Sequence, residues 1–375
     1  FVVSQLDYSG IQLIVMPDRD SAEYCAADLY NLVEGDSVFF LPDSGKKLEK
    51  SNYKSTLGVQ RTSAIGKILD YKEGRLIIVT YPSAVNEEIP DALTIKESLL
   101  KLNAGDEISH EDMVSKLFEN GFERVDFVAE PGQFAVRGAI VDIFSYSYSD
   151  PFRVSFFGDE IETINIFDCN TQLSKEKVQC AEIYPDLIAS EVESSSTHIA
   201  NILPKDALVW LDSSDMYKDM EFFPLLNRFR KIYMEVPLSR QDAQPVKFNI
   251  APQPSFNKNF ELLAEDIRIH LETGYKVKIY GEKRSQLERL GSILSQTGAM
   301  LPEFIPGKNI HNGFIDHDEK VCCYSDHEIF DRFHRVNMRR TVEKSEQLTI
   351  NDLTSFAIGD YVVHIDYGVG IFGGL

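Results

Sequence analysis

Apolar residues in the first hundred positions form short continuous runs that alternate with a segment of helical spacing. The runs 11–18, 37–43 and 75–82 end in polar or proline-containing loops, which is typical of buried strands. Between the first two runs, residues 21–35 place apolar side chains near helical spacing and stop at Gly35. Strands that alternate with helices predict a parallel α/β sheet.

The pattern changes to period two between residues 123 and 167. Before it, a capping box predicts a helix that opens at Ser109 and ends at Gly121. The segments ERVDFVAE, GQFAVRGAIVDIF, FRVSFF and EIETINIF then alternate apolar and polar positions. They predict an antiparallel meander with a tight hairpin at Gly158-Asp159.

Strand–helix alternation resumes from about residue 190, with ALVWLD and KIYMEV as expected strands. A second α/β unit is expected from about residue 245, with helices around 260–271 and 287–294, strands at KVKIY and KVCCY, and a last helix capped by Asp326. The closing GDYVVHIDYGVGIFGGL indicates strand–turn–strand. Because this would open a domain that does not finish, we interpret the chain as a fragment.

Composition narrows the classes of protein without choosing a function. The 375 residues carry 38 basic and 59 acidic side chains, a net charge of −21, which argues against a surface that grips DNA broadly. No apolar run approaches the roughly 20 residues of a membrane span, and the N-terminus does not resemble a signal peptide. The five cysteines have irregular spacing, and we expect reduced thiols and a cytoplasmic location without membrane contact.

Three motifs suggest chemistry, and each has a simpler explanation. Gly368-x-Gly370-x-x-Gly373 matches a dinucleotide fingerprint but lacks the helix that must follow, so a glycine-supplied turn is favoured. Residues 44–47 (SGKK) lack the upstream glycine and the following Ser/Thr of a phosphate loop. The acidic run 316–319 is a weak metal candidate or a solvated loop. We therefore expect no catalytic residue, metal site or cofactor in this chain.

The segment FRVSFF predicts a binding surface. Alternation puts Phe152, Val154 and Phe156 on a core face, and it puts Arg153 and Phe157 on the outer face. Arg137 is expected beside them on the preceding strand. An exposed aromatic with two arginines is typical of interface hot spots. Alternatively, a second layer covers Phe157, and the arginines only pair with Asp142 or Glu160.

The densest positive patch lies near residues 332–340. It comprises Arg332, Arg335, Arg339 and Arg340. It predicts either a local contact with nucleic acid or a solvated helix end and linker. The acidic surroundings favour the helix end and linker.

Several of these segments resemble a known family. EPGQFAVRGAIVDIF with FRVSFFGDEIETINIFDCNTQLS is similar to the motif shared by the excision-repair helicase subunit UvrB and the transcription-repair coupling factors (Mfd). SDHEIFDRFHR and the closing GDYVVHIDYGVGIFGGL also resemble the coupling factors, and the closing segment resembles the start of their RNA-polymerase-interacting domain. The resemblance is to the N-terminal region of that family.

The resemblance implies an α/β fold with a RecA-like UvrB-homology domain 1, an inserted and mostly antiparallel domain 2, and a small α/β domain 3. The implied limits are 1–100 for domain 1a without an ATP site, 101–187 for domain 2, 188–243 for domain 1b, 244–342 for domain 3, 343–357 for a linker, and 358–375 for the start of the polymerase-interacting domain.

The implied function is recruitment of the repair protein UvrA to stalled RNA polymerase. The family's UvrA-contacting residues correspond to Arg137, Arg153 and Phe157. RNA polymerase would bind the domain that begins near residue 358. ATP, Mg²⁺ and most DNA contact would belong to a translocase motor in the longer parent protein, C-terminal to these residues. The alternatives are a UvrB-like damage-verifying helicase fragment and a DNA-binding module.

Overall fold

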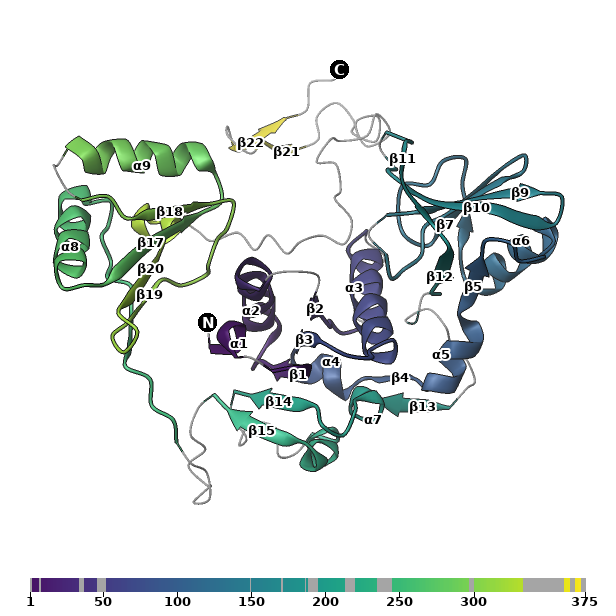
Figure 1. Ribbon diagram of the computed structural model, residues 1–375, viewed down its shortest axis with the longest axis horizontal. Coiled ribbons are helices and arrows are strands. Elements are labelled where there is room, and N and C mark those ends of the chain that lie inside the picture. The colour runs from purple at the N-terminus through teal and green to yellow at the C-terminus, as the bar shows by residue number, and fades with distance from the viewer. Residues whose placement is uncertain are drawn as a thin grey trace.

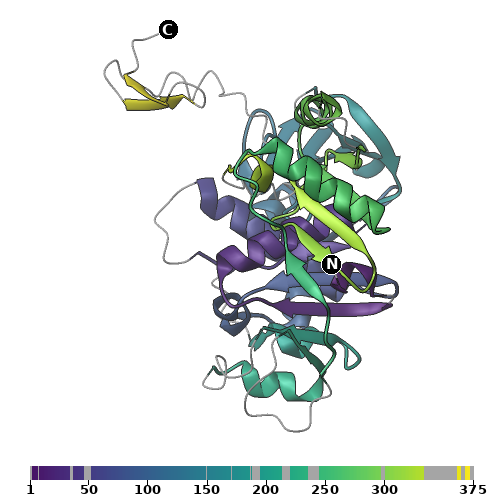
Figure 2. The same cartoon turned by 90° about the vertical axis from the view of Figure 1, so that its left-hand side faces the viewer.

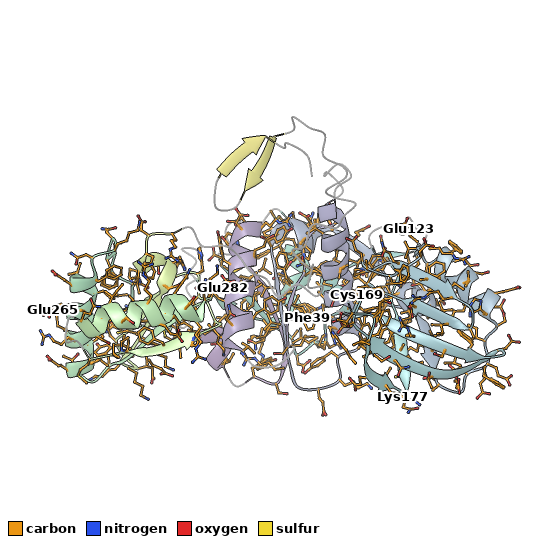
Figure 3. The ribbon with its side chains drawn as sticks, turned by 90° about the horizontal axis from the view of Figure 1, so that it is seen from above. Phe39, Glu123, Cys169, Lys177, Glu265 and Glu282 are labelled. Carbon is orange, nitrogen blue, oxygen red and sulfur yellow. The ribbon has the colours of Figure 1, made fainter. Side chains whose placement is uncertain are left out.

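The computed structural model describes three units joined along the chain (Figure 1). Seen from above, the unit that carries Phe39 lies between the unit with Glu123 and Lys177 and the unit with Glu265 (Figure 3). The structure describes residues 2–6, 8–33, 37–45, 52–148, 150–169, 171–185, 187, 195–212, 220–234, 245–296, 300–332, 361–364 and 368–371.

The first unit is a parallel five-stranded sheet, as predicted. Its strand order is β15-β14-β1-β3-β2. The strands are β1 (Gly10–Val15), β2 (Val38–Phe40), β3 (Arg75–Thr80), β14 (Leu208–Leu211) and β15 (Arg230–Tyr233), accompanied by α1 (Val2–Gln5), α2 (Arg19–Leu32), α3 (Asn52–Leu69), α4 (Pro82–Asn86), α7 (Ile199–Ile202) and η1 (Phe223–Arg228). Leu13 and Ile14 are both fully buried and belong to cores on opposite faces of the sheet. Burial on both faces explains the unbroken apolar runs.

The chain leaves and re-enters this unit through two antiparallel strand pairs. β4 (Glu88–Pro90) pairs with β13 (Ser196–His198), and β5 (Leu100–Asn103) pairs with β12 (Cys180–Ile183). Between β4 and β5 lies α5 (Ala92–Ser98), whose N-cap Asp91 accepts a hydrogen bond from the Thr94 N–H. Residues 104–179 are therefore an insertion whose two ends are paired.

The insertion is a six-stranded sheet in the order β11-β10-β9-β8-β7-β6. The elements are α6 (His110–Glu119), β6 (Glu123–Arg124), β7 (Gln133–Arg137), β8 (Ile140–Ile143), β9 (Phe152–Phe157), β10 (Glu160–Phe167) and β11 (Ser174–Val178). The predicted cap of α6 is confirmed, because the Ser109 hydroxyl accepts from the Asp112 N–H, 3.0 Å away. The hairpin at Gly158-Asp159 is also confirmed, with Gly158 at φ +65°.

Two details of the predicted meander are wrong. ERVDFVAE forms only the two-residue strand β6, which pairs parallel to β7, because the following residues fold back over the sheet. GQFAVRGAIVDIF is a hairpin of β7 and β8, so β8 separates Arg137 from Arg153. The two arginines are consequently not on neighbouring strands.

The third unit is a mixed sheet in the order β16-β19-β20-β17-β18. It comprises β16 (Ile250–Pro252), α8 (Phe260–Glu272), β17 (Lys276–Gly281), α9 (Arg284–Gln296), β18 (Glu303–Pro306), β19 (Phe314–Asp316), β20 (Val321–Ser325) and α10 (Asp326–Ile329). Cys322 and Cys323 are both buried, in different cores, as their adjacent strand positions predict. The cap of α10 is Ser325, whose hydroxyl accepts from the Glu328 N–H; Asp326 is the first helical residue and not the predicted cap.

The third unit contacts α2, and in the view of Figure 2 it lies in front of the first unit. The His311 N–H donates to Asp28 Oδ1 at 2.7 Å, and Asn31 Nδ2 donates to the Asn309 carbonyl at 2.7 Å. The His311 ring stacks on Tyr24 with 3.6 Å between ring centroids. Burial raises the pKa of Asp28 to about 7.

The two strands of the predicted C-terminal strand–turn–strand are present as an antiparallel pair, β21 (Tyr361–His364) with β22 (Gly368–Ile371), and residues 365–367 lie outside the described residues. Gly368 and Gly370 lie inside β22 and not in the expected turn, and Gly373 lies outside the described residues. The expected linker 343–357 and residues 358–360 also lie outside them. Among the described helices, none combines the length and the apolar character needed to cross a membrane.

Candidate protein-interaction site

The outer face of the inserted sheet carries an exposed aromatic side chain. Along β9, Phe152, Val154 and Phe156 are buried, whereas Arg153 is partly exposed and Phe157 is 77% exposed. The predicted alternation is therefore confirmed, and the alternative in which a second layer covers Phe157 is wrong. Leaving a phenyl ring in water is unfavourable, so this position is a candidate contact for a partner.

A buried carboxylate lies beneath the two arginines. Asp142, on β8, is 0% exposed and lies directly opposite Arg153 in the pairing of β8 with β9. Arg153 Nε donates to Asp142 Oδ1 at 2.7 Å, and Arg153 Nη2 donates to Asp142 Oδ2 at 3.0 Å. Arg137 Nη2, from β7, also donates to Oδ2. The predicted pairing of both arginines with Asp142 is thus confirmed, and Asp142 holds both guanidinium groups on the outer face of the sheet.

Arg153 is held from several sides. Nη1 donates to the Gln172 carbonyl at 3.1 Å, and Nη2 donates to Gln172 Oε1 at 3.1 Å. The guanidinium lies over the Phe167 ring, 4.2 Å from its centroid. Hydrogen bonding to Asp142 raises the pKa of Arg153. Its side chain is only 18% exposed, so Arg153 is a fixed part of the sheet face.

Arg137 is more open and has an aromatic neighbour that the sequence did not identify. Its side chain is 35% exposed, and its guanidinium lies 5.0 Å from the centroid of the Phe127 ring. Phe127 is itself 63% exposed. The alternating pattern predicts a strand through Phe127, so the sequence did not indicate that this side chain lies beside Arg137. The available signal was the spacing of Val125 and Val128, which is wrong for one face of a strand.

Of the arginines in the predicted basic patch, the structure describes Arg332. Arg332 is exposed, and its guanidinium lies 4.4 Å from the centroid of the Phe330 ring. Arg335, Arg339 and Arg340 lie outside the described residues. The structure therefore provides no geometry for a nucleic-acid contact there.

The carboxyl ends of the parallel strands form the region where α/β sheets of this kind bind nucleotides. The first turn of α2, which follows β1, is capped by Asp18, whose Oδ1 accepts from the Ser21 N–H at 2.8 Å. A carboxylate at this position repels phosphate oxygens and uses a donor that a phosphate would need. Nearby, Glu87 accepts from the Ser44 N–H and hydroxyl, at 2.7 and 2.9 Å. Lys46 and Lys47 of the predicted SGKK loop lie outside the described residues.

The acidic run 316–319 begins at the last residue of β19 and continues as a turn. Asp316 is 5% exposed, and its Oδ1 accepts from the backbone N–H groups of Asp318 and Glu319, both at 3.0 Å. His317 Nδ1 lies 2.9 Å from the Tyr275 hydroxyl. Within the described part of the chain, no three His, Cys, Asp or Glu side chains gather in a way that could hold a metal ion.

Comparison with known proteins places this face within a recognised domain. Residues 100–187 match the family model described as the UvrB interaction domain. The chain is similar to the transcription-repair-coupling factor of Borreliella burgdorferi, with 23% identity over 80% of this chain and 32% of the relative. It is 22% identical to that of Bacillus subtilis over 94% of this chain and 39% of the relative. It is 30% identical to that of Mycobacterium bovis over 57% of this chain and 18% of the relative.

The chain thus spans less than two fifths of the length of each of these relatives. The similarity extends from the parallel unit through the insertion, and Phe127, Arg137, Arg153 and Phe157 all fall inside the matched domain. The chain is therefore homologous to transcription-repair-coupling factors over most of its length, with a UvrB interaction domain at residues 100–187.

Proposed function

We propose that the inserted sheet recruits UvrA, and that this chain is the recruiting region of a transcription-repair coupling factor. The single observation that carries the proposal is the outer face of the inserted sheet, where a 77% exposed Phe157 lies on the same face as the arginines that share Asp142. These are the residues to which the family resemblance assigns UvrA contact. The match of residues 100–187 to the UvrB interaction domain supports a repair partner of this type.

The physical basis is burial of the phenyl ring beside fixed positive charge. An exposed phenylalanine that enters an apolar pocket gains about 1.5–3 kcal/mol from burial alone. The arginines are already ordered by Asp142, so their alignment costs little entropy when the partner binds. Aromatic and arginine side chains together dominate many interface hot spots. The face is therefore suited to binding a protein, and we assign no chemical step to it.

We further propose the domain limits that the resemblance implies. The strand pairs β4–β13 and β5–β12 support an insertion at 101–187 within a domain made of 1–100 and 188–243. The separate core of the third unit supports domain 3 at 244–342. From residue 358 the chain would enter the polymerase-interacting domain, which the β21–β22 pair supports. ATP-driven motion on DNA would belong to a motor in the longer parent protein.

The test is binding of purified UvrA to this chain on a biosensor surface. We expect saturable binding by the wild type and at least a tenfold weaker affinity for Phe157→Ala, because a hot-spot truncation costs about 1.4 kcal/mol or more. Phe118→Ala is the matched control, since Phe118 is 53% exposed but lies on α6. Equal binding by Phe157→Ala and wild type would sink the assignment of this face.

A further inference from the structure

We propose that Arg137 and Phe127 together receive an acidic side chain of the partner, whereas Arg153 positions the surface without contacting that side chain. This inference rests on the proposed docking of UvrA and assigns distinct roles within it. The two arginines differ in how many of their hydrogen-bond donors the described residues already occupy.

Arg153 is committed to its own domain. Its Nε, Nη1 and Nη2 all donate to Asp142 or Gln172, and its face covers Phe167. A guanidinium has five N–H donors in a planar fork, and a carboxylate partner needs two neighbouring ones for a bidentate contact. In Arg153 four of these five donors are engaged, one on Nε, one on Nη1 and two on Nη2, so a new carboxylate could form a bidentate contact only by displacing Asp142 or Gln172.

Arg137 has donors to spare. Among the described residues, its hydrogen bonding is the single contact from Nη2 to Asp142. Nη2 keeps a second N–H, so an edge of the guanidinium that combines Nη2 with Nε or with Nη1 remains open to a partner, and 35% of the side chain is exposed. Arg137 can keep its bond to Asp142 while it forms a second, charge-assisted contact on its open edge.

Phe127 is fixed beside the guanidinium of Arg137. Its neighbour Val128 is 2% exposed and packs with Ala135 and Phe144 on the outer face of the sheet. Gln133 Oε1 accepts from the Ala129 N–H and the Glu130 N–H, both at 2.9 Å, which ties the segment to β7. The Phe127 ring is thus held over Arg137 before any partner arrives, and it can cover the ion pair from water.

The net charge of the arginine cluster and of its rim indicates which side chain of the partner fits this surface. Two guanidinium groups share one carboxylate, so the cluster of Arg137, Arg153 and Asp142 retains one positive charge. The rim is acidic, because Asp126 precedes Phe127 and Glu160 lies opposite Phe157 across the hairpin. An extensive acidic patch would be repelled by this rim. The surface therefore fits one aspartate or glutamate set among apolar residues.

The experiment measures the affinity of purified UvrA for the full chain at low and high ionic strength. We expect Phe127→Ala to weaken binding by about tenfold and Arg137→Gln by about tenfold or more, with a smaller salt dependence in Arg137→Gln. Because Phe127 acts through Arg137, the double variant should lose less than the product of the two single losses. Arg137→Lys, which keeps the charge but not the planar fork, should bind between wild type and Arg137→Gln.

Two control variants have similar side chains away from this face. Phe118→Ala removes an exposed phenyl ring from α6, and Arg284→Gln removes an 80% exposed guanidinium from α9. Both should bind within twofold of the wild type. Circular dichroism spectra that match the wild type at the assay temperature will show that the test variants are folded.

The outcomes separate this inference from the function on which it rests. If the wild type binds UvrA and Phe157→Ala does not, but Phe127→Ala and Arg137→Gln bind like the wild type, the assigned roles are wrong and the docking face stands. If the wild type does not bind UvrA at all, both the proposed function and this inference are overturned. Weakening by Phe127→Ala and Arg137→Gln, with both controls unaffected, supports the inference.

Discussion

Removal of Arg153 should destabilise the inserted sheet much more than removal of Arg137. Both arginines contact the fully buried carboxylate of Asp142, but they do so unequally. Arg153→Ala deletes the two bonds of 2.7 and 3.0 Å and leaves the single contact from Arg137. Arg137→Ala leaves both bonds of Arg153 intact.

The magnitudes follow from burial. Breaking a buried ion pair costs about 3–5 kcal/mol, and the remaining arginine places Arg153→Ala near the lower limit, at about 3 kcal/mol. Arg137 is 35% exposed and contributes one bond, so its loss should cost about 1 kcal/mol. The difference of about 2 kcal/mol corresponds to a roughly 30-fold difference between the two variants in the equilibrium constant for local opening of the inserted sheet.

The assay is hydrogen–deuterium exchange of peptides that cover β8 and β9, read by mass spectrometry in the full chain. Exchange there should be about 30 times faster in Arg153→Ala than in Arg137→Ala. Arg284→Ala, on the third unit, serves as the control and should leave these peptides unchanged. Equal acceleration in both arginine variants, or a larger effect in Arg137→Ala, would refute the unequal sharing of Asp142.

Three other predictions concern different parts of the chain. Burial raises the pKa of Asp28 from 3.8 to about 7. Docking of the third unit on α2 should therefore be strongest below pH 4 and weaken as the pH rises through 7. Hydrogen–deuterium exchange of peptides around His311 should become faster as docking weakens, and this pH dependence should be absent in Asp28→Asn. Gly132→Ala should lower the free energy of unfolding by about 1–2 kcal/mol, because Gly132 has φ +85° and an added Cβ would meet the Tyr146 hydroxyl. Urea unfolding followed by circular dichroism measures this change, and an unchanged midpoint would contradict it. With Asp18 at the start of α2, the chain should release no phosphate from ATP, and saturable turnover would instead favour the helicase alternative.

The hydrophobic pattern predicted the strands and their exposed faces correctly where burial alone determines the structure. Continuous apolar runs identified β1, β3 and β14 because both faces of the parallel sheet are covered. Strict alternation identified the outer face of β9 because one face is buried and the other is not. The pattern did not predict α3, in which Gly66 approaches the Tyr184 ring so closely that an added Cβ would lie 3.2 Å from it. The contact with Tyr184 is tertiary, but Leu57, Ala64, Ile65 and Ile68 are buried at helical spacing, so the sequence did carry a signal for this helix.

The site was predicted in part, and the missing part depends on contacts between distant segments. The sequence placed Arg153 and Phe157 on one face, but it could not show that β8 lies between Arg137 and Arg153. A lone aspartate in the apolar stretch AIVDIF was the signal that Asp142 needs buried partners. The position of Phe127 depends on how its segment folds over the sheet, which local spacing does not determine.

The most direct test of the account is the affinity of UvrA for the wild-type chain and for Phe157→Ala, measured together with Phe118→Ala. The account predicts saturable binding by the wild type, similar binding by Phe118→Ala, and at least a tenfold loss in Phe157→Ala. Failure of the wild type to bind, or equal affinity in Phe157→Ala, would contradict the claim that the outer face of β9 recruits UvrA.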